Sequence, residues 1–331
     1  MTNSASERRL TSPYHQKNFF EKTAEGFKKN RSIFWFLIPA MAFSLIFSYI
    51  PMFGVTFAFK DTSFNDAMRR HASILGALIY SHWTLNTFAS IFDNTFWAAL
   101  SNSLIINLLK LFLIFPLSII LAIQLADMKS QKLAKLILII LCIPDFLSWT
   151  VVIKIWTNFF NPDTGLLGRL LAGVTSGNHV TYFEASFKPL FLFYAAWKGT
   201  GWGSILYYAA ITSIDKSFYE AATVEGANLF QKAIYLTIPS IGATIALMMV
   251  LSISGFTSVG LEQAQLMLNG ASYYEKEWTL DLYIWQLSIG DGAGVNYVQA
   301  AAVGVFNGFV SLFLMLTGNV LTTKFLHEGL W

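Results

Sequence analysis

The chain alternates between long apolar runs and shorter polar segments, and six of the runs are long enough to cross a membrane. A helix rises about 1.5 Å per residue, so a hydrocarbon layer of about 30 Å takes roughly 20 apolar residues. Each run is apolar on nearly all sides of the helix that it predicts, as expected for a helix surrounded by lipid or by other helices. The sequence therefore predicts an all-α integral membrane protein with six transmembrane helices, at residues 32–53, 103–125, 134–156, 189–211, 238–259 and 300–323.

The composition supports a membrane protein and excludes several other classes. Of the 331 residues, 55% are hydrophobic and only 12% are charged, whereas about 25% of a soluble globular chain is charged. So apolar a chain is not intrinsically disordered, and the single cysteine, Cys142, cannot close an intramolecular disulfide. The formal net charge of +3 is too small to indicate nucleic-acid binding.

Basic residues predict the orientation of the helices. Residues 1–31 form a polar tail rich in Lys and Arg, and further lysines follow the second and fourth apolar runs. Because cytoplasmic loops carry the excess of Lys and Arg, we expect both termini in the cytoplasm. The first apolar run is too long for a signal-peptide core, so we expect it to stay as an anchor. The expected organisation is a basic cytoplasmic tail (1–31), a first transmembrane helix with a long extracytoplasmic loop (32–95) and a five-helix core (96–331).

The loop between the fourth and fifth runs, residues 212–237, reads as two amphipathic half-helices hinged at Gly226. Alanine pairs allow another surface to approach closely, and Pro239 stands where the next helix begins, at a place where its missing N–H costs little. Two interpretations remain open on physical grounds. The loop is either an interfacial helix that lies on the lipid headgroups or a knob that fits a cleft in a soluble partner and transmits its motion.

The same loop resembles the EAA loop of binding-protein-dependent ABC importers. The matched positions keep the spacing of that family without a gap, although Glu225 replaces the usual Asp and Ile238 replaces the frequent Leu. The resemblance implies that this loop contacts an ATPase, with Glu220 against a basic group of the partner. The coupling residues that it implies are Glu220, Ala221, Ala222, Glu225, Gly226, Ala227, Gln231 and Pro239.

The resemblance extends over nearly all of residues 32–331 and narrows the family to sugar importers. Residues 85–102 resemble the segment that leads into the second span of carbohydrate permeases. Residues 48–54, 58–61, 201–204 and 330–331 resemble the subgroup that imports polysaccharide fragments and complex oligosaccharides. The implied fold is the MetI-like ABC importer permease fold, a multi-pass protein of the bacterial inner membrane in which residues 96–331 form a five-helix transport core with a coupling loop at 212–237.

The resemblance also implies partners. They are a second homologous permease subunit, a dimer of ATP-binding subunits, an extracytoplasmic solute-binding protein and the lipid bilayer. The phosphate-binding pattern Gly-x-x-x-x-Gly-Lys-Ser/Thr does not occur in the sequence. We therefore expect a transport subunit that is not an enzyme and holds no cofactor, with ATP and Mg on the partner ATPases. The alternatives are an integral-membrane lipid-linked glycosyl transferase and an ABC permease for another small solute.

Ionisable residues inside the apolar runs are costly and therefore mark candidate functional positions. Asp145 and Lys198 are predicted at similar depth, whereas Lys110 and Lys154 lie nearer the outer face. One interpretation is an Asp145–Lys198 charge pair with the two outer lysines snorkelling to the interface. The other is a hydrated cavity in which these groups meet a polar solute, an acidic sugar included, with Pro144 freeing backbone groups to line it.

Aromatic rings are the remaining candidates for a solute path, because sugars rest their apolar faces on rings. With Asp145 and Lys198, the candidate path comprises Trp149, Tyr194, Trp197 and Trp202. The alternative is that these rings anchor the protein at the membrane interfaces, where Trp and Tyr are common. The five histidines fall in tails and loops without ligand spacing, so no metal site is expected.

Overall fold

The computed structural model describes residues 31–70, 73–161, 164–169, 187–268, 277–290 and 295–326. Within these residues the regular structure is helical, apart from an isolated antiparallel bridge between Lys60 and Trp83. Most of the basic tail and the closing residues 330–331 lie outside the described residues, as do four of the histidines: His15, His71, His179 and His327.

The chain divides into two compact units, Met1–Gly54 and Val55–Trp331. In the first unit, α2 (Arg31–Ser44) continues into η1 (Leu45–Tyr49), and the boundary falls within η2 (Ile50–Phe59). The side chains described from residue 35 to residue 52 are all exposed, most of them apolar. A helix this apolar with no buried side chain has to be covered by lipid or by another protein.

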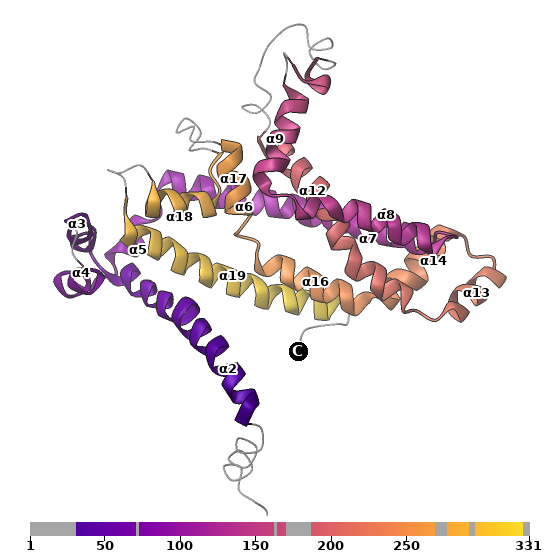
Figure 1. Ribbon diagram of the computed structural model, residues 1–331, viewed down its shortest axis with the longest axis horizontal. Helices are drawn as coiled ribbons and strands as arrows, with labels where there is room; N and C mark the ends of the chain where they lie inside the picture. The colour runs from indigo at the N-terminus through magenta and orange to yellow at the C-terminus, as the bar shows by residue number, and fades with distance from the viewer. Residues whose placement is uncertain are drawn as a thin grey trace, which may run out of the picture. The chain divides into compact units, whose positions relative to one another are not determined.

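The second unit contains the remaining helices, drawn in Figure 1. In chain order after η2 they are α3 (Ser63–Arg69), α4 (Ile74–Tyr80), α5 (Asn86–Ser90), α6 (Asn94–Leu109), η3 (Lys110–Ile114), α7 (Phe115–Ala126), α8 (Gln131–Cys142), η4 (Ile143–Phe146), α9 (Trp149–Phe160), α12 (Phe187–Thr212), α13 (Lys216–Val224), α14 (Leu229–Lys232), η5 (Ala233–Thr237), α15 (Ile238–Ser240), α16 (Gly242–Ser254), α17 (Leu261–Leu268), α18 (Leu280–Ile289) and α19 (Tyr297–Leu326).

Among the described residues, three continuous helical segments are long and apolar enough to cross a membrane: Trp35–Phe59, Asn94–Ala126 and Tyr297–Lys324. They contain most of the first predicted run and all of the second and sixth. The second segment begins nine residues before the prediction. Its start is set by Asp93, whose side chain accepts a hydrogen bond of 2.6 Å from the backbone N–H of Phe96. This cap satisfies one of the free N–H groups of the first turn, so polar residues before the apolar run are already helical.

The third and fifth predicted runs are bent and not continuous helices. Gln131–Phe146 and Trp149–Phe160 meet at 98°, and Leu229–Ser240 and Gly242–Ser254 meet at 71°. Each bend has a proline just before it, Pro144 or Pro239, which lacks a backbone N–H. If each bent pair counts as one span, five crossings are present among the described residues.

The fourth predicted run lies within α12, which is 26 residues long. It is not among the segments that are apolar enough to span by composition, because Lys198 and the small or polar residues at 199–204 interrupt it. These same small residues allow close packing. A Cβ placed on Gly201 would lie 2.0 Å from the backbone oxygen of Leu141, so α12 contacts the backbone of α8 directly.

The core of the second unit lies where α7, α8 and α12 run side by side (Figure 1). Their buried side chains pack together and against the start of α16. A second cluster joins α6, α18 and α19. The members of the first cluster include Ala122, Leu138, Cys142, Tyr207 and Ile245. Burial of this apolar surface stabilises the bundle, so its stability does not depend on the segments that project from it.

The turn after α16 is fixed by polar side chains from α6 and η3. The amide of Asn107 donates to the backbone oxygens of Phe256 and Ser258, at 2.7 and 3.0 Å. The ammonium of Lys110 donates to the backbone oxygen of Val259 at 2.8 Å. In the structure the ammonium of Lys110 is thus held by a partly buried backbone oxygen of the protein.

Candidate functional site

The loop at 212–237 contains two short helices joined at a glycine. Asp215 caps the first helix, α13, by accepting a hydrogen bond of 3.0 Å from the backbone N–H of Ser217. That hydrogen bond, with a second one to the Ser217 hydroxyl, lowers the pKa of the Asp215 carboxyl. At the other end Gly226 has a φ of 83°, a backbone conformation that residues with a side chain rarely adopt. The backbone N–H of Ala227 donates a hydrogen bond to the backbone oxygen of Ala222. The glycine therefore ends α13 and turns the chain.

The second helix of the loop, α14, starts with a reciprocal cap. The side chain of Asn228 accepts from the backbone N–H of Gln231 at 2.8 Å, and the side chain of Gln231 accepts from the backbone N–H of Asn228 at 2.9 Å. Sequence reasoning selected Gln231 as a partner contact and did not select Asn228. The spacing Asn-x-x-Gln is the signal that could have found the pair, because it is the pattern of a capping box.

The two short helices of the loop lie on the surface. None of the residues of α13 and α14 is buried, and Phe218 and Phe230 are exposed. Two hydrogen bonds hold the loop in shape: the Tyr219 hydroxyl lies 2.9 Å from the Thr237 hydroxyl, and Lys232 donates to the Thr223 hydroxyl at 2.8 Å. The Tyr219 contact connects α13 to η5, which leads into α15 and α16. This hydrogen bond therefore links α13 to the bent fifth segment.

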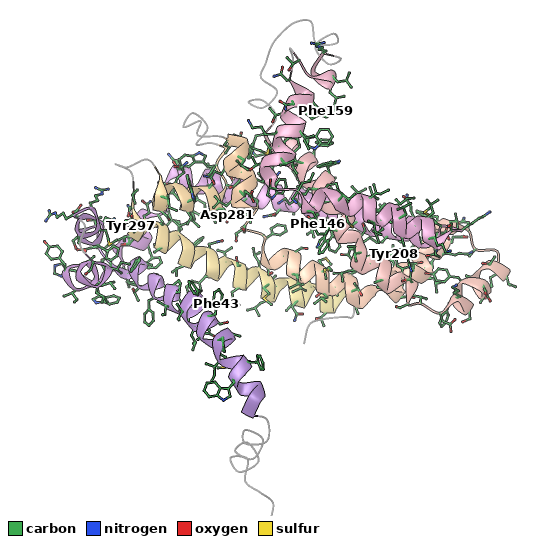
Figure 2. All side chains as sticks on the ribbon, viewed as in Figure 1. Phe43, Phe146, Phe159, Tyr208, Asp281 and Tyr297 are labelled. Atoms are coloured by element: carbon green, nitrogen blue, oxygen red, sulfur yellow. The ribbon has the colours of Figure 1, made fainter. Side chains whose placement is uncertain are left out.

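The two faces of α13 line different cavities. Lys216, Tyr219, Glu220 and Thr223 line a cavity of about 680 Å³ together with residues of α7, α8 and α12, including Tyr208 (Figure 2). The opposite face lines a notch of about 480 Å³ between α13 and the segment after it. We call this notch the coupling notch; its lining residues are Phe218, Ala221, Ala222, Glu225, Gly226, Ala227, Gln231, Lys232, Tyr235 and Leu236.

This geometry places the predicted coupling residues in two groups. Ala221, Ala222, Glu225, Gly226, Ala227 and Gln231 share the coupling notch. Glu220 faces the other cavity, and Pro239 belongs to α15 and lines neither of the two. The notch is open on a surface with small side chains at its centre, so it can accept a protruding side chain of another protein.

The predicted pairing of Asp145 with Lys198 is present in the structure. The ammonium of Lys198 lies 3.7 Å from a carboxylate oxygen of Asp145. The same ammonium donates to the backbone oxygens of Pro144 (3.4 Å), Asp145 and Leu147 (2.8 Å). The Pro144 oxygen also accepts from the backbone N–H of Leu147 at 3.2 Å, and the Asp145 and Leu147 oxygens lie where η4 ends and the helical hydrogen bonds are interrupted. Lys198 therefore stabilises the break between η4 and α9, beside Phe146 (Figure 2).

The aromatic candidates separate into two places. Trp149, Tyr194 and Trp197 belong to one cluster with Trp156, and the ammonium of Lys198 lies 5.5 Å from the centre of the Trp149 ring. Trp202 lies apart from them, packed edge-on against Phe146 at 6.0 Å. Sequence reasoning missed the residue at the centre of the cluster. Trp156 contacts five rings: Phe159, Phe160, Phe193, Tyr194 and Trp197.

Two buried polar atoms in this cluster have no hydrogen-bond partner, the indole N–H of Trp156 and the hydroxyl of Tyr194. Unpaired buried polar groups are costly and mark places where a water, ion or ligand completes the site. The i, i+4 spacing of Trp156 and Phe160 on α9 is the sequence signal for their ring contact, which is tilted at 5.9 Å. Trp156 thus joins the candidate solute path.

Comparison with known proteins finds relatives that match 92% of the chain. No family model matches it. The chain is 33% identical to protein LplB of Bacillus subtilis (strain 168), over 92% of each chain. It is 30% identical to the polygalacturonan/rhamnogalacturonan transport system permease protein YteP of the same organism, over 92% of this chain and 91% of the relative.

Solved structures agree with these relatives. A bacterial ABC transporter involved in the import of the acidic polysaccharide alginate is similar with a TM-score of 0.78 at 28% identity, over 92% of this chain and 99% of that chain. The alginate transporter in complex with an alginate pentasaccharide-bound periplasmic protein is similar with a TM-score of 0.77. These relatives are transport proteins of the membrane, so the comparisons do not favour a glycosyl transferase. The chain belongs to the family of sugar ABC transporter permeases, the membrane subunits of importers for oligosaccharides and polysaccharides.

Proposed function

We propose that this chain moves oligosaccharides or polysaccharide fragments into the cytoplasm by alternating access, driven by separate ATPase subunits that grip the loop α13–Gly226–α14. The observation that carries the proposal is the coupling notch. Four of its lining residues are small (Ala221, Ala222, Gly226 and Ala227), it lies on an exposed loop, and Gly226 gives the loop its sharp turn. Such a surface fits a partner that has to approach the backbone closely.

The loop is suited to pass motion on to the bundle. Its own hydrogen bonds keep α13 and α14 in shape, and the Tyr219–Thr237 contact ties α13 to η5. The next element is the 71° bend before α16, and α16 packs along α19 (Figure 1). ATPase closure would therefore shift the fifth segment against the sixth, which is the kind of rigid-body step that alternating access requires.

The topology belongs to this proposal. We infer six spans, with α12 as the fourth and each bent pair as one, and both termini in the cytoplasm. The partners are a second homologous permease subunit, a dimer of ATP-binding subunits that hold ATP and Mg, and an extracytoplasmic solute-binding protein. Gly304 and Gly308 of α19 support a helical partner, because a Cβ on either would meet no atom of the described chain within 4 Å.

We further propose an acidic saccharide as the cargo. Support comes from the relatives, which include a polygalacturonan/rhamnogalacturonan permease and an importer of the acidic polysaccharide alginate. Lys198 is not an argument for an acidic cargo, because its ammonium is already shared among Asp145 and three backbone oxygens. The proposed contact surface is the half-buried rings of Trp149, Trp156 and Trp197, which pack around the fully buried Tyr194.

The coupling proposal is tested with Glu220→Lys and Gly226→Asp in the complete transporter. We expect both variants to insert normally and to co-purify with the sister permease, but to lose ATP-driven uptake, because one reverses a charge beside α13 and the other puts a charge into the coupling notch. The matched control is Glu262→Lys, an equal charge reversal at an exposed position on α17. Normal uptake by Gly226→Asp would remove the loop from the mechanism.

The cargo proposal is tested by competition in proteoliposomes that contain the full complex and its binding protein. Uronate oligosaccharides should be taken up, whereas neutral oligosaccharides of the same length should neither be taken up nor compete. Equal uptake of the two sets would reject the acidic cargo and leave the importer assignment intact.

A further inference from the structure

The segment after η2 carries a patch of apolar side chains that the described chain leaves open. It comprises Leu75, Ile79 and Tyr80 of α4 with Trp83 and Leu85 of the following loop; we call it the α4 patch. Ile79 is 86% exposed and Trp83 is 68% exposed. On the surface of a soluble protein, contiguous apolar side chains of this kind mark an interaction site.

A buried lysine holds the α4 patch in a fixed position. Lys60 is 2% exposed, and its ammonium donates to the backbone oxygens of Leu78 (2.8 Å) and Ser81 (3.1 Å). The same ammonium lies 4.0 Å from the centre of the Trp83 ring. Lys60 thus caps the end of α4 and holds the Trp83 ring at the edge of the patch. The patch is therefore a surface of fixed structure.

The patch also adjoins the end of a membrane segment. The backbone N–H of Thr84 donates to the oxygen of Phe59 at 2.9 Å, and the N–H of Asp61 donates to the oxygen of His82 at 3.1 Å. The apolar helical segment Trp35–Phe59 has 25 residues, and at about 1.5 Å per residue it is longer than the roughly 30 Å hydrocarbon layer. Phe59, the last residue of this segment, therefore lies near a membrane surface, and these hydrogen bonds keep the patch beside it.

We propose that the α4 patch is an interfacial anchor, inserted among the headgroups and upper acyl chains of the outer leaflet. The inference rests on the orientation given under the proposed function. Lipid is the occupant because the patch is hydrogen-bonded to the end of the apolar segment at Phe59, because Trp and Tyr are the side chains that settle at the membrane interface, and because the seven residues of α4 include no charge. A docking site for a soluble protein would carry a polar rim.

The sequence offers a clean way to measure this depth, since Cys142 is its single cysteine and is buried. In the complete transporter with Cys142→Ala, an environment-sensitive fluorophore is attached at Ile79→Cys, and at Leu75→Cys as a second position. The matched control is Asp66→Cys, on the exposed face of the neighbouring helix α3. Each is reconstituted into phosphatidylglycerol–phosphatidylethanolamine vesicles with or without lipids that bear a quencher on the upper acyl chain.

We expect the lipid-borne quencher to reduce emission from positions 75 and 79 strongly, and aqueous iodide to quench them about threefold less than position 66. Equal iodide quenching at positions 79 and 66 would overturn the anchor, as would protection of position 79 only after the solute-binding protein is added. Sidedness separates this result from the proposed function. If an impermeant maleimide reaches Asp66→Cys only from the cytoplasmic side, the orientation itself is wrong; if uptake and sidedness are normal but lipid quenching is absent, only the anchor fails.

Discussion

Two glycines show how differently the bundle and the coupling loop are built. Gly201 lies in the middle of α12, where an added Cβ would be 2.0 Å from the backbone oxygen of Leu141. Gly226 lies between α13 and α14, where an added Cβ would meet nothing within 4 Å, but its φ is 83°. Gly201 has to be glycine because there is no space for a Cβ, whereas Gly226 has to be glycine because of its backbone conformation. The bundle is therefore specified by packing, and the loop by local geometry that leaves its surface free.

The largest effect is expected at Gly201. Gly201→Ala pushes α12 away from α8, because the Cβ would collide with backbone and not with a flexible side chain. Overpacking of this kind costs about 3 kcal/mol of stability. The measurement is the thermal unfolding of the purified complex together with its yield in the membrane.

The control for this substitution lies in the same helix. A Cβ on Gly199 meets nothing within 4 Å, so Gly199→Ala should raise stability by about 0.5 to 1 kcal/mol through the better helix propensity of alanine. If the two variants were equally stable, the close contact between α12 and α8 would not be real.

At Gly226 the expected effect is on uptake more than on stability. Alanine pays the left-handed backbone cost of about 1 to 2 kcal/mol, whereas asparagine tolerates that conformation better. Stability should therefore fall more in Gly226→Ala than in Gly226→Asn. Uptake should fall more in Gly226→Asn, because the larger side chain enters the coupling notch that the ATPase has to fill.

Measuring both quantities on both variants separates the two requirements. Thermal unfolding ranks the backbone strain, and ATP-driven uptake ranks the space left for the partner. An uptake ranking that simply followed the stability ranking would contradict the placement of the partner in the coupling notch.

The same contrast explains what the sequence could predict. The long apolar runs predicted the segments of the bundle, because a helix needs about 20 apolar residues to cross the lipid, whichever helices it packs against. Bends were harder. The prolines at 144 and 239 were visible in the sequence, but the 98° break also depends on Lys198, which is more than 50 residues away and supplies donors to the backbone oxygens at the break. The similar depth of Asp145 and Lys198 predicted their pairing, but nothing in the local sequence indicates the contacts of Lys198 with the backbone oxygens.

In the loop, local patterns were more informative than in the bundle. The hinge at Gly226 was identified from residue type and spacing, and the structure gives that residue a positive φ. The helical pattern of α13 already places Glu220 on another face than Ala221 and Ala222, and the structure has them line different cavities, because successive positions on a helix point about 100° apart. A partner that contacts both has to cover both faces.

A smaller effect is expected at Asn228, whose side chain accepts from the N–H of Gln231. Asn228→Ala should cost about 1 kcal/mol, which is typical of a lost N-cap, while Asn228→Asp keeps the acceptor and should cost little. Hydrogen exchange of α14 measures the change. Equal protection of the two variants would show that the fold of the loop does not depend on its cap, and the contrast with the packed bundle would weaken.

The smallest effect is a pH dependence at the start of α13. The backbone N–H and the hydroxyl of Ser217 lower the pKa of Asp215 from the ordinary value of 3.8, so its cap is fully present above that pH and is lost as the pH falls through the lowered value.

Asp61, just before α3 in the second unit, provides the comparison. Burial raises its pKa, but hydrogen bonds from Ser63 and from the backbone of His82 outweigh this and lower it overall. Hydrogen exchange, corrected for its intrinsic pH dependence, should therefore show α13 losing protection in acid in the wild type and not in Asp215→Asn. The α3 segment, whose aspartate Asp61 is unchanged in that variant, should respond equally in both proteins, because the cap of α13 is local to the loop.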